Sequence, residues 1–537
     1  MIFDLANDPM ASGGTDHEFV DHRSKSIVDA LRDQQTLLTP VALFSDEYEG
    51  KSVHDRFTHL IPLSKPNPGE QYAFEVNLDA CTGCKACVAA CHSLNGLDDD
   101  ESWRDMGLLV GTRNQPYLQT VTTACHHCED PACSNGCPVL AYDKDKVTGI
   151  VRHLDDQCIG CSYCILKCPY DVPKLNFKRG IVRKCDMCHG RLAAGEAPAC
   201  VQACPNEAIR IRTVRRSEVP ARGRMITGAF DSSYTRPTTT YVSSKPIPST
   251  AKAADADRLE LDHSHPPLAW MLVLTQMSAG TFIGCAVAVW MDALTLNQAA
   301  VTSASALVLG LAGIALSVLH LGQPLKAWRA FLGWRKSWLS REILAFGALP
   351  GGGSTIAVAW WLGDLNWLRI AISGTAIAAV SAVFCSVMVY VDTRRPFWSL
   401  RMTAGKFFGT MLLLGAGLCS VVWSWAELTI ASLAMAPALF FRWTLSIWEL
   451  SRNHLALRNE NHPWHRSALI LRKHLPHHIE LRGLLLISTG LLIPVLIAAE
   501  APKPWMLTTS LILTFVSQLV ERHYFFTAAA GSKMPGN

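Results

Sequence analysis

The stretch CIGCSYCILKCP, residues 158–169, decides the fold class of the first half of the chain. Its four cysteines have the spacing Cys-x2-Cys-x2-Cys-x3-Cys and are followed by proline, as in bacterial runs of iron-sulfur ligands. In such a run three thiolates on one tight loop bind three irons of a cubane, and the fourth thiolate is carried away to a different cluster. The stretch therefore predicts [4Fe-4S] clusters that are held by more than one motif.

Three further motifs surround this stretch. With it they contain sixteen of the 19 cysteines, and four complete sets predict four [4Fe-4S] clusters. These motifs are Cys81, Cys84, Cys87 and Cys91; Cys125, Cys128, Cys133 and Cys137; and Cys185, Cys188, Cys200 and Cys204. The remaining Cys285, Cys385 and Cys419 stand singly in apolar runs, where a free cysteine usually packs as a small hydrophobic residue.

Zinc and disulfides are the alternatives for so many cysteines. Zinc sites join two Cys-x2-Cys pairs across a longer gap, whereas the third motif packs four cysteines into residues 158–168. Disulfides are disfavoured because the orientation predicted below keeps these thiols in a reducing compartment. Both alternatives rank well behind iron and sulfur.

The second half of the chain is much more apolar than the first. The whole sequence of 537 residues is 49% apolar and only 18% charged, which indicates a membrane part joined to a soluble part. The net charge of +4 is too small to favour nucleic acid as a partner. Eight apolar stretches, each near the ~20 residues that a helix needs to cross the hydrocarbon, predict eight spans. Their approximate cores are residues 268–290, 299–319, 343–362, 368–391, 407–425, 428–447, 484–499 and 505–520.

The loops between these stretches predict the orientation. Lys and Arg gather in the loops of one side, around residues 326–341, 394–406 and 452–482, and the opposite loops are mainly acidic. Because basic loops stay in the cytoplasm, we expect a multi-pass protein of the cytoplasmic (inner) membrane. An even number of spans places both termini and the iron-sulfur half on the cytoplasmic side. No cleavable export signal is evident in residues 1–20.

Two segments flank the cysteine-rich half. Residues 1–72 form an N-terminal extension, in which residues 27–38 predict a short amphipathic helix. Residues 213–266 are rich in Pro, Ser and Thr, so we expect an extended connector that is either free or ordered along the soluble domain. The expected domains are the cluster-binding part at 73–212, the membrane anchor at 267–524 and a C-terminal tail at 525–537.

The sequence resembles two subunits of a known enzyme family. VNLDACTGCKACVAACHSLNG, TACHHCEDPACSNGCP, GIVRHLDDQCIGCSYCILKCPYDVPK and IVRKCDMCHGRLAAGEAPACVQACPNEAI look like the four-cluster electron-transfer subunit of dimethyl sulfoxide reductase type molybdoenzymes. The segment with LHLGQPLKAWRAFLGWRKSWLSREIL is similar to the eight-helix membrane anchor subunit. These are normally two chains, so the fusion departs from the family. The resemblance implies an α+β ferredoxin-like four-cluster domain of two double-cubane lobes, followed by an all-α membrane domain of eight transmembrane helices.

The resemblance also implies which cysteines share a cluster, because the family pairs the first motif with the fourth and the second with the third. The first pair of motifs would form the sets Cys81, Cys84, Cys87 and Cys204, and Cys185, Cys188, Cys200 and Cys91. The second pair would form the sets Cys125, Cys128, Cys133 and Cys168, and Cys158, Cys161, Cys164 and Cys137. Spacing alone supports only the exchange of each fourth cysteine.

Electron transfer at a membrane needs a partner there, either haem or quinone. A transmembrane haem needs axial ligands, most simply two histidines at bilayer depth, and only His320 lies at the edge of a span. We therefore expect no haem and a quinol or quinone substrate. From the residues alone, His320 is equally a proton-exchanging group or an interfacial helix cap. The resemblance, in which this histidine is associated with quinol binding, favours the former.

Glu342, at the start of the third span, is the second candidate for the quinol site. It lies on the same side of the membrane as His320, and its alternative role is a charge favoured by the helix dipole. Arg442, near the end of the sixth span, is expected to reach towards the membrane surface.

Together these features predict an electron-transfer and membrane-anchor subunit among membrane lipids. We expect it to pass electrons between the menaquinone or ubiquinone pool and a separate molybdopterin catalytic subunit, in anaerobic-type respiration. The alternative is the same wiring in reverse, in which a substrate such as sulfite is oxidised and quinone is reduced. A membrane-anchored cluster sensor is a third interpretation, which four wired clusters disfavour. The terminal substrate and the direction of electron flow stay open.

Overall fold

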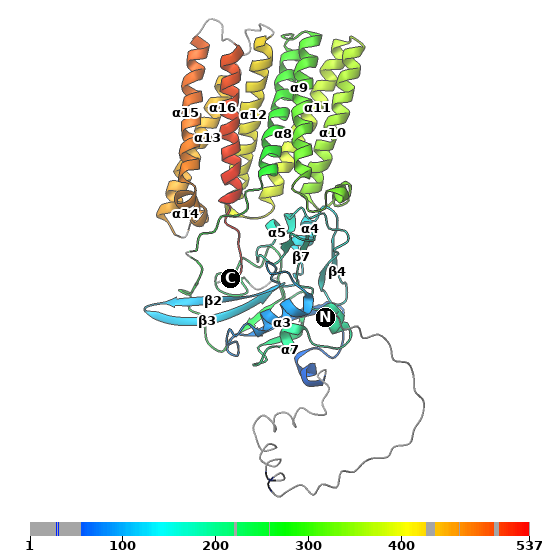
Figure 1. Cartoon of the computed structure of the whole chain (residues 1–537), viewed down its shortest axis with the longest axis vertical. Helices are drawn as coiled ribbons and strands as arrows, with labels where there is room; N and C mark the ends of the chain where they lie inside the picture. The colour runs from blue at the N-terminus through cyan, green and yellow to red at the C-terminus, as the bar shows by residue number, and fades with distance from the viewer. Residues whose placement is uncertain are drawn as a thin grey trace, which may run out of the picture. The chain divides into compact units, whose positions relative to one another are not determined.

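The computed structural model describes Val28, Leu31 and residues 55–219, 223–256, 258–425, 435–460, 462–498 and 504–535. The chain divides into two units, residues 1–56 and 57–537, and the second contains both the cysteine motifs and the long helices. Of the amphipathic helix predicted over residues 27–38, Val28 and Leu31 are helical and the rest lies outside the described residues. Figure 1 shows the second unit, with long helices at one end and strands and short helices at the other.

A three-stranded sheet joins the two ends of the cysteine-rich half. Its order is β8-β1-β9, formed by β1 (Glu70–Asn77), β8 (Ile209–Arg215) and β9 (Thr240–Val242). β1 pairs antiparallel with β8, where Phe74 lies opposite Ile211, and parallel with β9. Because β1 precedes the first cysteine motif and β8 follows the fourth, their pairing brings these two motifs together. β1 also begins ahead of the domain start expected at residue 73.

Two small antiparallel hairpins connect the second, third and fourth motifs. β4 (Tyr142–Lys144) pairs with β5 (Val151–His153), and β6 (Lys174–Asn176) pairs with β7 (Ile181–Arg183). Each hairpin follows the Cys-Pro pair that ends one motif, and it leads the chain to the start of the next motif. The motifs are thereby stacked close to one another although they are up to about a hundred residues apart in sequence.

Short helices within the motifs pack in two pairs. α4 (Ala132–Gly136) packs on α5 (Tyr163–Lys167), and α3 (Ala86–Asn95) packs on α7 (Ala199–Gln202). The first pair joins the second motif to the third, and the second pair joins the first motif to the fourth. This is the pairing of motifs that the resemblance implies.

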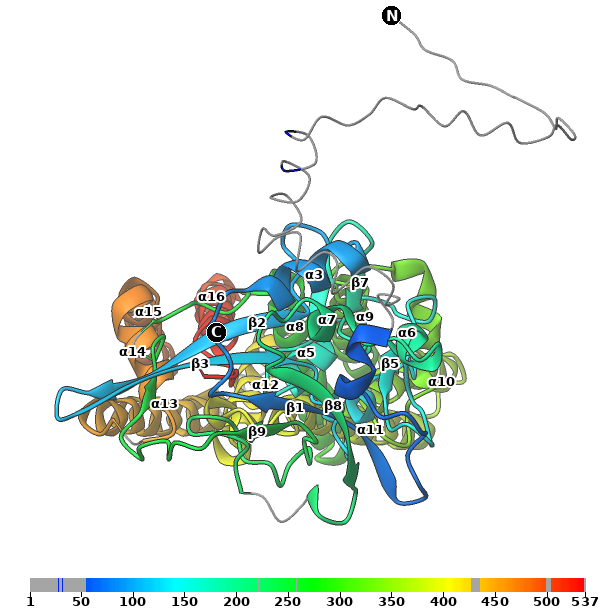
Figure 2. The same cartoon turned by 90° about the horizontal axis from the view of Figure 1, so that it is seen from below.

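A long hairpin and parts of the connector complete this half. The hairpin consists of β2 (Arg104–Thr112) and β3 (Gln115–Ala124), and it projects sideways from the other strands (Figure 2). The edge of β2 pairs with β10 (Lys252–Ala253). Both β9 and β10 belong to the expected connector, so these parts of the connector lie along the soluble half.

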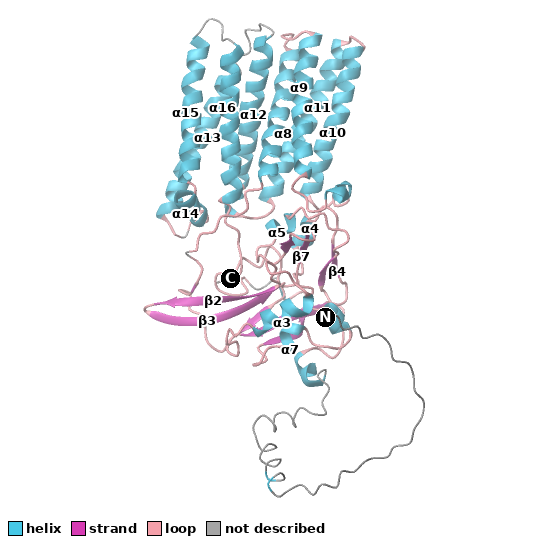
Figure 3. Ribbon diagram, viewed as in Figure 1, coloured by secondary structure: helices cyan, strands magenta, loops and turns pink. Residues whose placement is uncertain are grey.

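Within the described residues, long helices occur near all eight positions predicted for spans (Figure 3). They are α8 (Pro266–Trp290), α9 (Leu296–Val318), α10 (Trp338–Trp361), α11 (Leu365–Val391), α12 (Leu400–Trp425), α13 (Met435–Arg458), α15 (Pro476–Ala498) and α16 (Pro504–Thr527). The first five are long and apolar enough to cross a membrane. The other three carry the buried charges described next, and that they also cross stays a prediction.

A buried network of charges connects α12 with α13, α15 and α16. Lys406 Nζ lies 2.8 Å from Glu449 Oε1 and 3.1 Å from Glu521 Oε1, and Arg482 Nη1 lies 3.2 Å from Glu449 Oε2. Charges that are withdrawn from water have to be paired in this way. The approximate apolar core of the sixth stretch ends at residue 447, whereas α13 continues to Arg458 and includes Glu449.

Arg442 differs from its prediction. It does not reach the membrane surface: its side chain is 0% exposed, and its Nη2 lies 3.8 Å from Glu521 Oε2 of α16. Arg522 also pairs with Glu521 and donates a hydrogen bond to Gln276 Oε1 of α8 at 2.8 Å. The acidic partner lies inside the bundle, and this draws the guanidinium of Arg442 inwards.

Candidate functional site

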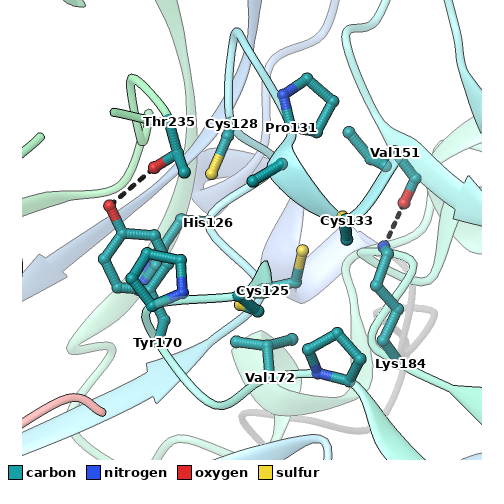
Figure 4. Close-up of a pocket in the computed structure, with 14 residues that line it drawn as sticks. Cys125, His126, Cys128, Pro131, Cys133, Val151, Tyr170, Val172, Lys184 and Thr235 are labelled. Atoms are coloured by element: carbon teal, nitrogen blue, oxygen red, sulfur yellow. Dashed lines mark hydrogen bonds between the residues drawn. The ribbon is translucent and has the colours of Figure 1, made fainter. Parts of the chain in front are cut away.

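One pocket combines cysteines of two motifs. Cys125, Cys128 and Cys133 of the second motif and Cys168 of the third line one pocket (Figure 4). This is one of the four-cysteine sets implied by the resemblance, including the exchange of the fourth cysteine. Thiolates are the ligands of [4Fe-4S] clusters, so four thiols around one small cavity fit such a cluster.

The connector forms one wall of this pocket. Thr235 lines the cavity, and its hydroxyl lies 2.8 Å from the hydroxyl of Tyr170 (Figure 4). Nearby, His126 Nδ1 lies 2.9 Å from Thr239 Oγ1. The segment that joins the two halves of the chain is therefore also part of this pocket.

The cysteines of the other sets are also close neighbours. The pKa of the Cys164 thiol lies well above its usual value, first because it is buried and further because Cys158 and Cys137 lie nearby. Burial likewise raises the pKa of Cys91 to about 12, and the neighbouring Cys200 adds to the effect. Cys137 thus lies with the third motif and Cys91 with the fourth, as the exchange of fourth cysteines requires.

The remaining set joins the first motif to the end of the fourth. Cys204 is among the neighbours of the buried Cys87, and Cys84 of the same motif is exposed. Across the part of the chain that the structure describes, no three Cys, His, Asp or Glu side chains converge on a point suited to a single metal ion.

Two buried cations lie next to the thiols. Lys184 lines the pocket of Figure 4, and its Nζ donates hydrogen bonds to the carbonyls of Val151 and Cys185. Burial lowers the pKa of Lys184, but the nearby thiolates outweigh this and hold it above its usual value. Arg104 on β2 is 2% exposed and donates from Nη1 to Thr122 Oγ1 at 3.1 Å. Both cations can offset the negative charge of thiolate ligands.

Sequence reasoning missed both cations. Lys184 stands directly before Cys185, so its place beside a motif was a usable signal. Arg104 lies between two motifs and reaches the thiols only because β2 folds back over the first motif, which no local pattern indicates.

Backbone amides donate hydrogen bonds to the fourth cysteine of two motifs. The N–H of Ala141 donates to Cys137 Sγ at 3.2 Å, and the N–H of Ala208 donates to Cys204 Sγ at 3.2 Å. In both motifs the cysteine is followed by proline, and the turn after the proline returns an amide to the sulfur. Hydrogen bonds to the sulfurs are one of the features that set the reduction potential of an iron-sulfur cluster.

The third motif and the end of the second contact the loops of the helical half. The N–H of Gly322, just after α9, donates to the carbonyl of Gly160 at 3.4 Å, and the N–H of Gly333 donates to that of Pro138 at 2.7 Å. Gly160 lies between two cysteines of the third motif, and Pro138 follows Cys137. The loop before α10 therefore rests on the set that combines the third motif with Cys137.

Helix α5 fixes the same contact on its other side. The hydroxyl of Tyr163 donates to the main-chain carbonyl of Val389 near the end of α11 at 2.9 Å. Lys167 Nζ lies 2.6 Å from Asp392 Oδ2, and Lys167 is only 3% exposed. This buried ion pair and hydrogen bond hold the third motif against α11.

His320 lies just beyond the end of α9, in the loop that touches the third motif. Its Nδ1 contacts the carbonyl oxygen of Ser317. A carbonyl oxygen only accepts, so Nδ1 carries the proton and Nε2 is left as an acceptor in the neutral ring. Burial lowers the pKa of His320 to about 4, which keeps the ring neutral at pH 7.

Glu342 lies in α10 and is buried, with 4% of its surface exposed. The hydroxyl of Ser386 on α11 donates to its Oε1. The carboxyl group therefore faces a neighbouring helix instead of the solvent beyond its own N-terminus. His320 and Glu342 lie near the same end of the bundle, but no hydrogen bond or ion pair joins them in the described structure.

Comparison with known proteins agrees with both halves. Residues 117–214 match the family model of a 4Fe-4S dicluster domain, and residues 262–528 match that of the dimethyl sulfoxide reductase anchor subunit. The protein is 38% identical over 148 residues to the probable anaerobic dimethyl sulfoxide reductase subunit YnfG of Escherichia coli (strain K12). The alignment covers 26% of this protein and 72% of the relative. It belongs to this family.

Other relatives of the iron-sulfur half carry different names. Thiosulfate reductase electron transfer subunit PhsB of Salmonella typhi is 37% identical over 155 residues, covering 28% of this protein and 79% of the relative. Formate dehydrogenase-O iron-sulfur subunit of Escherichia coli (strain K12) is 33% identical over 188 residues, covering 30% and 63%. In this member of the dimethyl sulfoxide reductase family, an iron-sulfur electron-transfer subunit and a membrane anchor subunit are fused in one membrane protein.

Proposed function

We propose that this protein transfers electrons between membrane quinol or quinone and a separate molybdopterin catalytic subunit. The observation that carries the proposal is the contact between the third cysteine motif and the loop that contains His320. It puts a cofactor pocket and a candidate quinol group on the two sides of one interface. The family and the names of its relatives, which are subunits of dimethyl sulfoxide and thiosulfate reductases, support a partner that carries the terminal substrate.

The sixteen cysteines would hold four [4Fe-4S] clusters in the sets given above. Once bound, these clusters supply one-electron transfer. The pocket of Cys125, Cys128, Cys133 and Cys168 supports one set through its lining, and the neighbours of Cys137, Cys91 and Cys204 support the other three.

His320 would accept a hydrogen bond from a quinol hydroxyl through Nε2. The contact of Nδ1 with Ser317 fixes this tautomer and the direction of the ring. Because the ring is neutral, it presents a lone pair to the hydroxyl and no charge that would repel a departing proton. Glu342, buried beside Ser386, is the second group of the proposed quinol site and would take a proton at its free carboxyl oxygen.

The direction of electron flow is the open part of the proposal. The reductase names among the relatives favour quinol oxidation, and we propose this direction first. Formate dehydrogenase-O, whose iron-sulfur subunit is also similar, is named for oxidation of its substrate. Oxidation of a substrate such as sulfite with reduction of quinone is therefore the second candidate for this protein.

The proposed orientation places the iron-sulfur half in the cytoplasm. The basic loops after α9, after α11 and around α14 (His465–His474) lie at the end of the bundle that faces this half (Figure 1). By the positive-inside rule this end is cytoplasmic. Accessibility of cysteines introduced into the α10–α11 loop and at position 472 would distinguish the two sides in intact cells.

The test is His320→Ala in the intact complex with its co-purified catalytic partner. Quinol oxidation should fall by about a hundredfold, as expected for loss of a positioned proton acceptor. Activity with an artificial dye that reduces the catalytic subunit directly should be unchanged. His474→Ala, on the exposed side of α14, is the matched control and should leave both activities unchanged. Unchanged quinol oxidation in His320→Ala would refute the assignment.

A further inference from the structure

An open cavity of about 710 Å³ lies where the iron-sulfur half meets the ends of α10 and α11. Its lining comes from three sources: the second and third cysteine motifs, the connector, and the loops next to the two helices. The cavity is separate from the cysteine pocket of Figure 4 and is not lined by His320 or Glu342. The proposed electron transfer does not use it.

Charged side chains dominate this cavity, and its three carboxylates are already engaged. Asp392 pairs with Lys167 at 2.6 Å, and Asp130 Oδ1 accepts from Asn135 Nδ2 at 2.6 Å. Asp231 Oδ1 accepts from the backbone N–H of Ser233 at 2.8 Å. Each acid is thus held by a donor next to it in the lining.

Three cations of the lining are not paired with a carboxylate. Lys336 and Arg341 come from the start of α10, and Arg394 follows the end of α11. Among the described residues no carboxylate lies within ion-pair distance of any of them. Arg394 lies over the ring of Tyr234, at 5.8 Å from its centroid, and Arg341 lies over that of Trp338 at 4.4 Å. The cavity therefore presents three cations that form no ion pair with the carboxylates of its lining.

The cavity also continues onto an apolar surface of the helices. Trp338 lines it and contacts Phe384 of α11, with ring centroids 6.1 Å apart. Phe384 is 45% exposed, and Ile377, two turns further along the same face of α11, is 68% exposed. Since both helices are long and apolar enough to cross a membrane, this face is one that acyl chains cover.

We propose that this cavity binds the phosphate group of one anionic phospholipid through Lys336 and Arg394. Its acyl chains would follow Trp338, Phe384 and Ile377 into the membrane. Basic pockets at the ends of membrane helices bind anionic headgroups through such cations, and guanidinium and ammonium groups both suit phosphate oxygens. An inorganic phosphate ion has the same charge chemistry, but it gains nothing from the adjoining apolar face, which is why we assign a lipid.

Native mass spectrometry of the full-length protein, purified in a nonionic detergent, tests the proposal. The protein is titrated with phosphatidylglycerol, with zwitterionic phosphatidylcholine and with inorganic phosphate. We expect one phosphatidylglycerol to bind more tightly than further copies, and neither phosphatidylcholine nor inorganic phosphate to displace it. The double variant Lys336→Gln/Arg394→Gln should weaken this first binding step about thirtyfold, the effect of removing two membrane-surface cations.

The matched control is Arg401→Gln/Lys473→Gln, which removes two exposed cations at the same end of the helices but outside the cavity. It should keep the tight first lipid. Equal binding by wild type and the cavity variant, or tight binding of phosphatidylcholine, would overturn the proposal. Displacement by inorganic phosphate would overturn the lipid assignment. Since no turnover is measured, these outcomes are independent of whether the protein oxidises quinol, and an unchanged iron content shows that the variant is folded.

Discussion

Gly322 of the membrane half packs between Gly160 of the third cysteine motif and Gly180, and neither Gly322 nor Gly160 has room for a side chain. A methyl group on Gly160 would lie 2.9 Å from both the Cα and the N of Gly322. Gly160 also has φ of +68°, which disfavours other residues. At this point the two fused halves meet through bare backbone, at the loop between two proposed cluster ligands.

Gly322→Ala should separate these halves locally. The added methyl group has to displace the backbone of Gly180, and overpacking of this kind costs about 1–3 kcal/mol. We expect slower electron transfer from quinol to the catalytic partner with an unchanged iron content, measured by stopped-flow reduction. Gly347→Ala in α10, where the added Cβ meets nothing within 4 Å, is the control and should behave as wild type. Equal rates in both variants would show that the contact does not matter for transfer.

Serine substitutions can test which cysteines share a cluster. If the fourth cysteines are exchanged, Cys125→Ser and Cys168→Ser should alter the same electron paramagnetic resonance signal, although the residues belong to different motifs. Cys158→Ser should alter another signal, because its set is completed by Cys137. Cys285→Ser, in the apolar interior of α8, should leave all signals and the iron content unchanged. If Cys168→Ser and Cys158→Ser altered the same signal, the exchange of fourth cysteines between motifs would be contradicted.

Lys184→Gln should lower the reduction potential of the cluster in the pocket of Figure 4. The variant removes a buried positive charge from the lining and so disfavours the added electron. A shift on the order of 60 mV corresponds to a tenfold change in a one-electron equilibrium. Redox titration followed by electron paramagnetic resonance measures it. Lys178→Gln, whose ammonium is exposed and pairs with Asp98, should leave the potential unchanged.

Glu521→Gln should destabilise the second half of the helix bundle. It removes the carboxylate shared by Lys406, Arg442 and Arg522, and uncompensated buried charge of this kind costs about 3–5 kcal/mol. A lower thermal unfolding temperature in detergent would show this. Glu460→Gln, which breaks an exposed pair with Lys252, should change it little. Equal stability of the two variants would contradict the importance of the buried network.

The pH dependence of quinol oxidation should reflect a neutral His320. The pKa of this group is lowered to about 4, so acidification from pH 7 does not protonate it until well below the usual histidine range near about 6.5. In a Glu342→Gln background, where the second proposed group does not titrate, the ratio of quinol activity to dye activity should therefore stay constant from about pH 7 to about pH 5.5. A decline with a midpoint near the usual value would show that His320 is accessible to water or is not part of the site.

Much of this organisation was visible in the sequence, because cluster ligands are local. Four cysteines at fixed spacing, as in residues 158–168, predict a cofactor without any knowledge of the fold, and long apolar stretches predict helices equally directly. The pairing of motifs came from a resemblance, and the packing of α4 on α5 and of α3 on α7 supports it.

What the sequence concealed depends on contacts between distant segments. Arg442 stands near the end of an apolar stretch, where an arginine is expected to reach the membrane surface. It turns inwards because Glu521, which is far away in the sequence, lies beside it on another helix. The same holds for Arg104, which reaches the thiols through a strand pairing, and for Thr235, which a Pro- and Ser-rich segment carries into a cofactor pocket. No local spacing encodes such partners.

The position of Thr235 has a consequence for assembly. In a two-chain enzyme the anchor can leave while the iron-sulfur subunit keeps its cofactors, and the cell can make the two subunits in different amounts. Here the two parts are one polypeptide, so their ratio is fixed at synthesis, and the connector to the anchor also lines the proposed cluster pocket. Insertion of iron and sulfur and insertion into the bilayer thereby become two steps in the maturation of a single polypeptide. A fault in either step leaves that polypeptide incomplete.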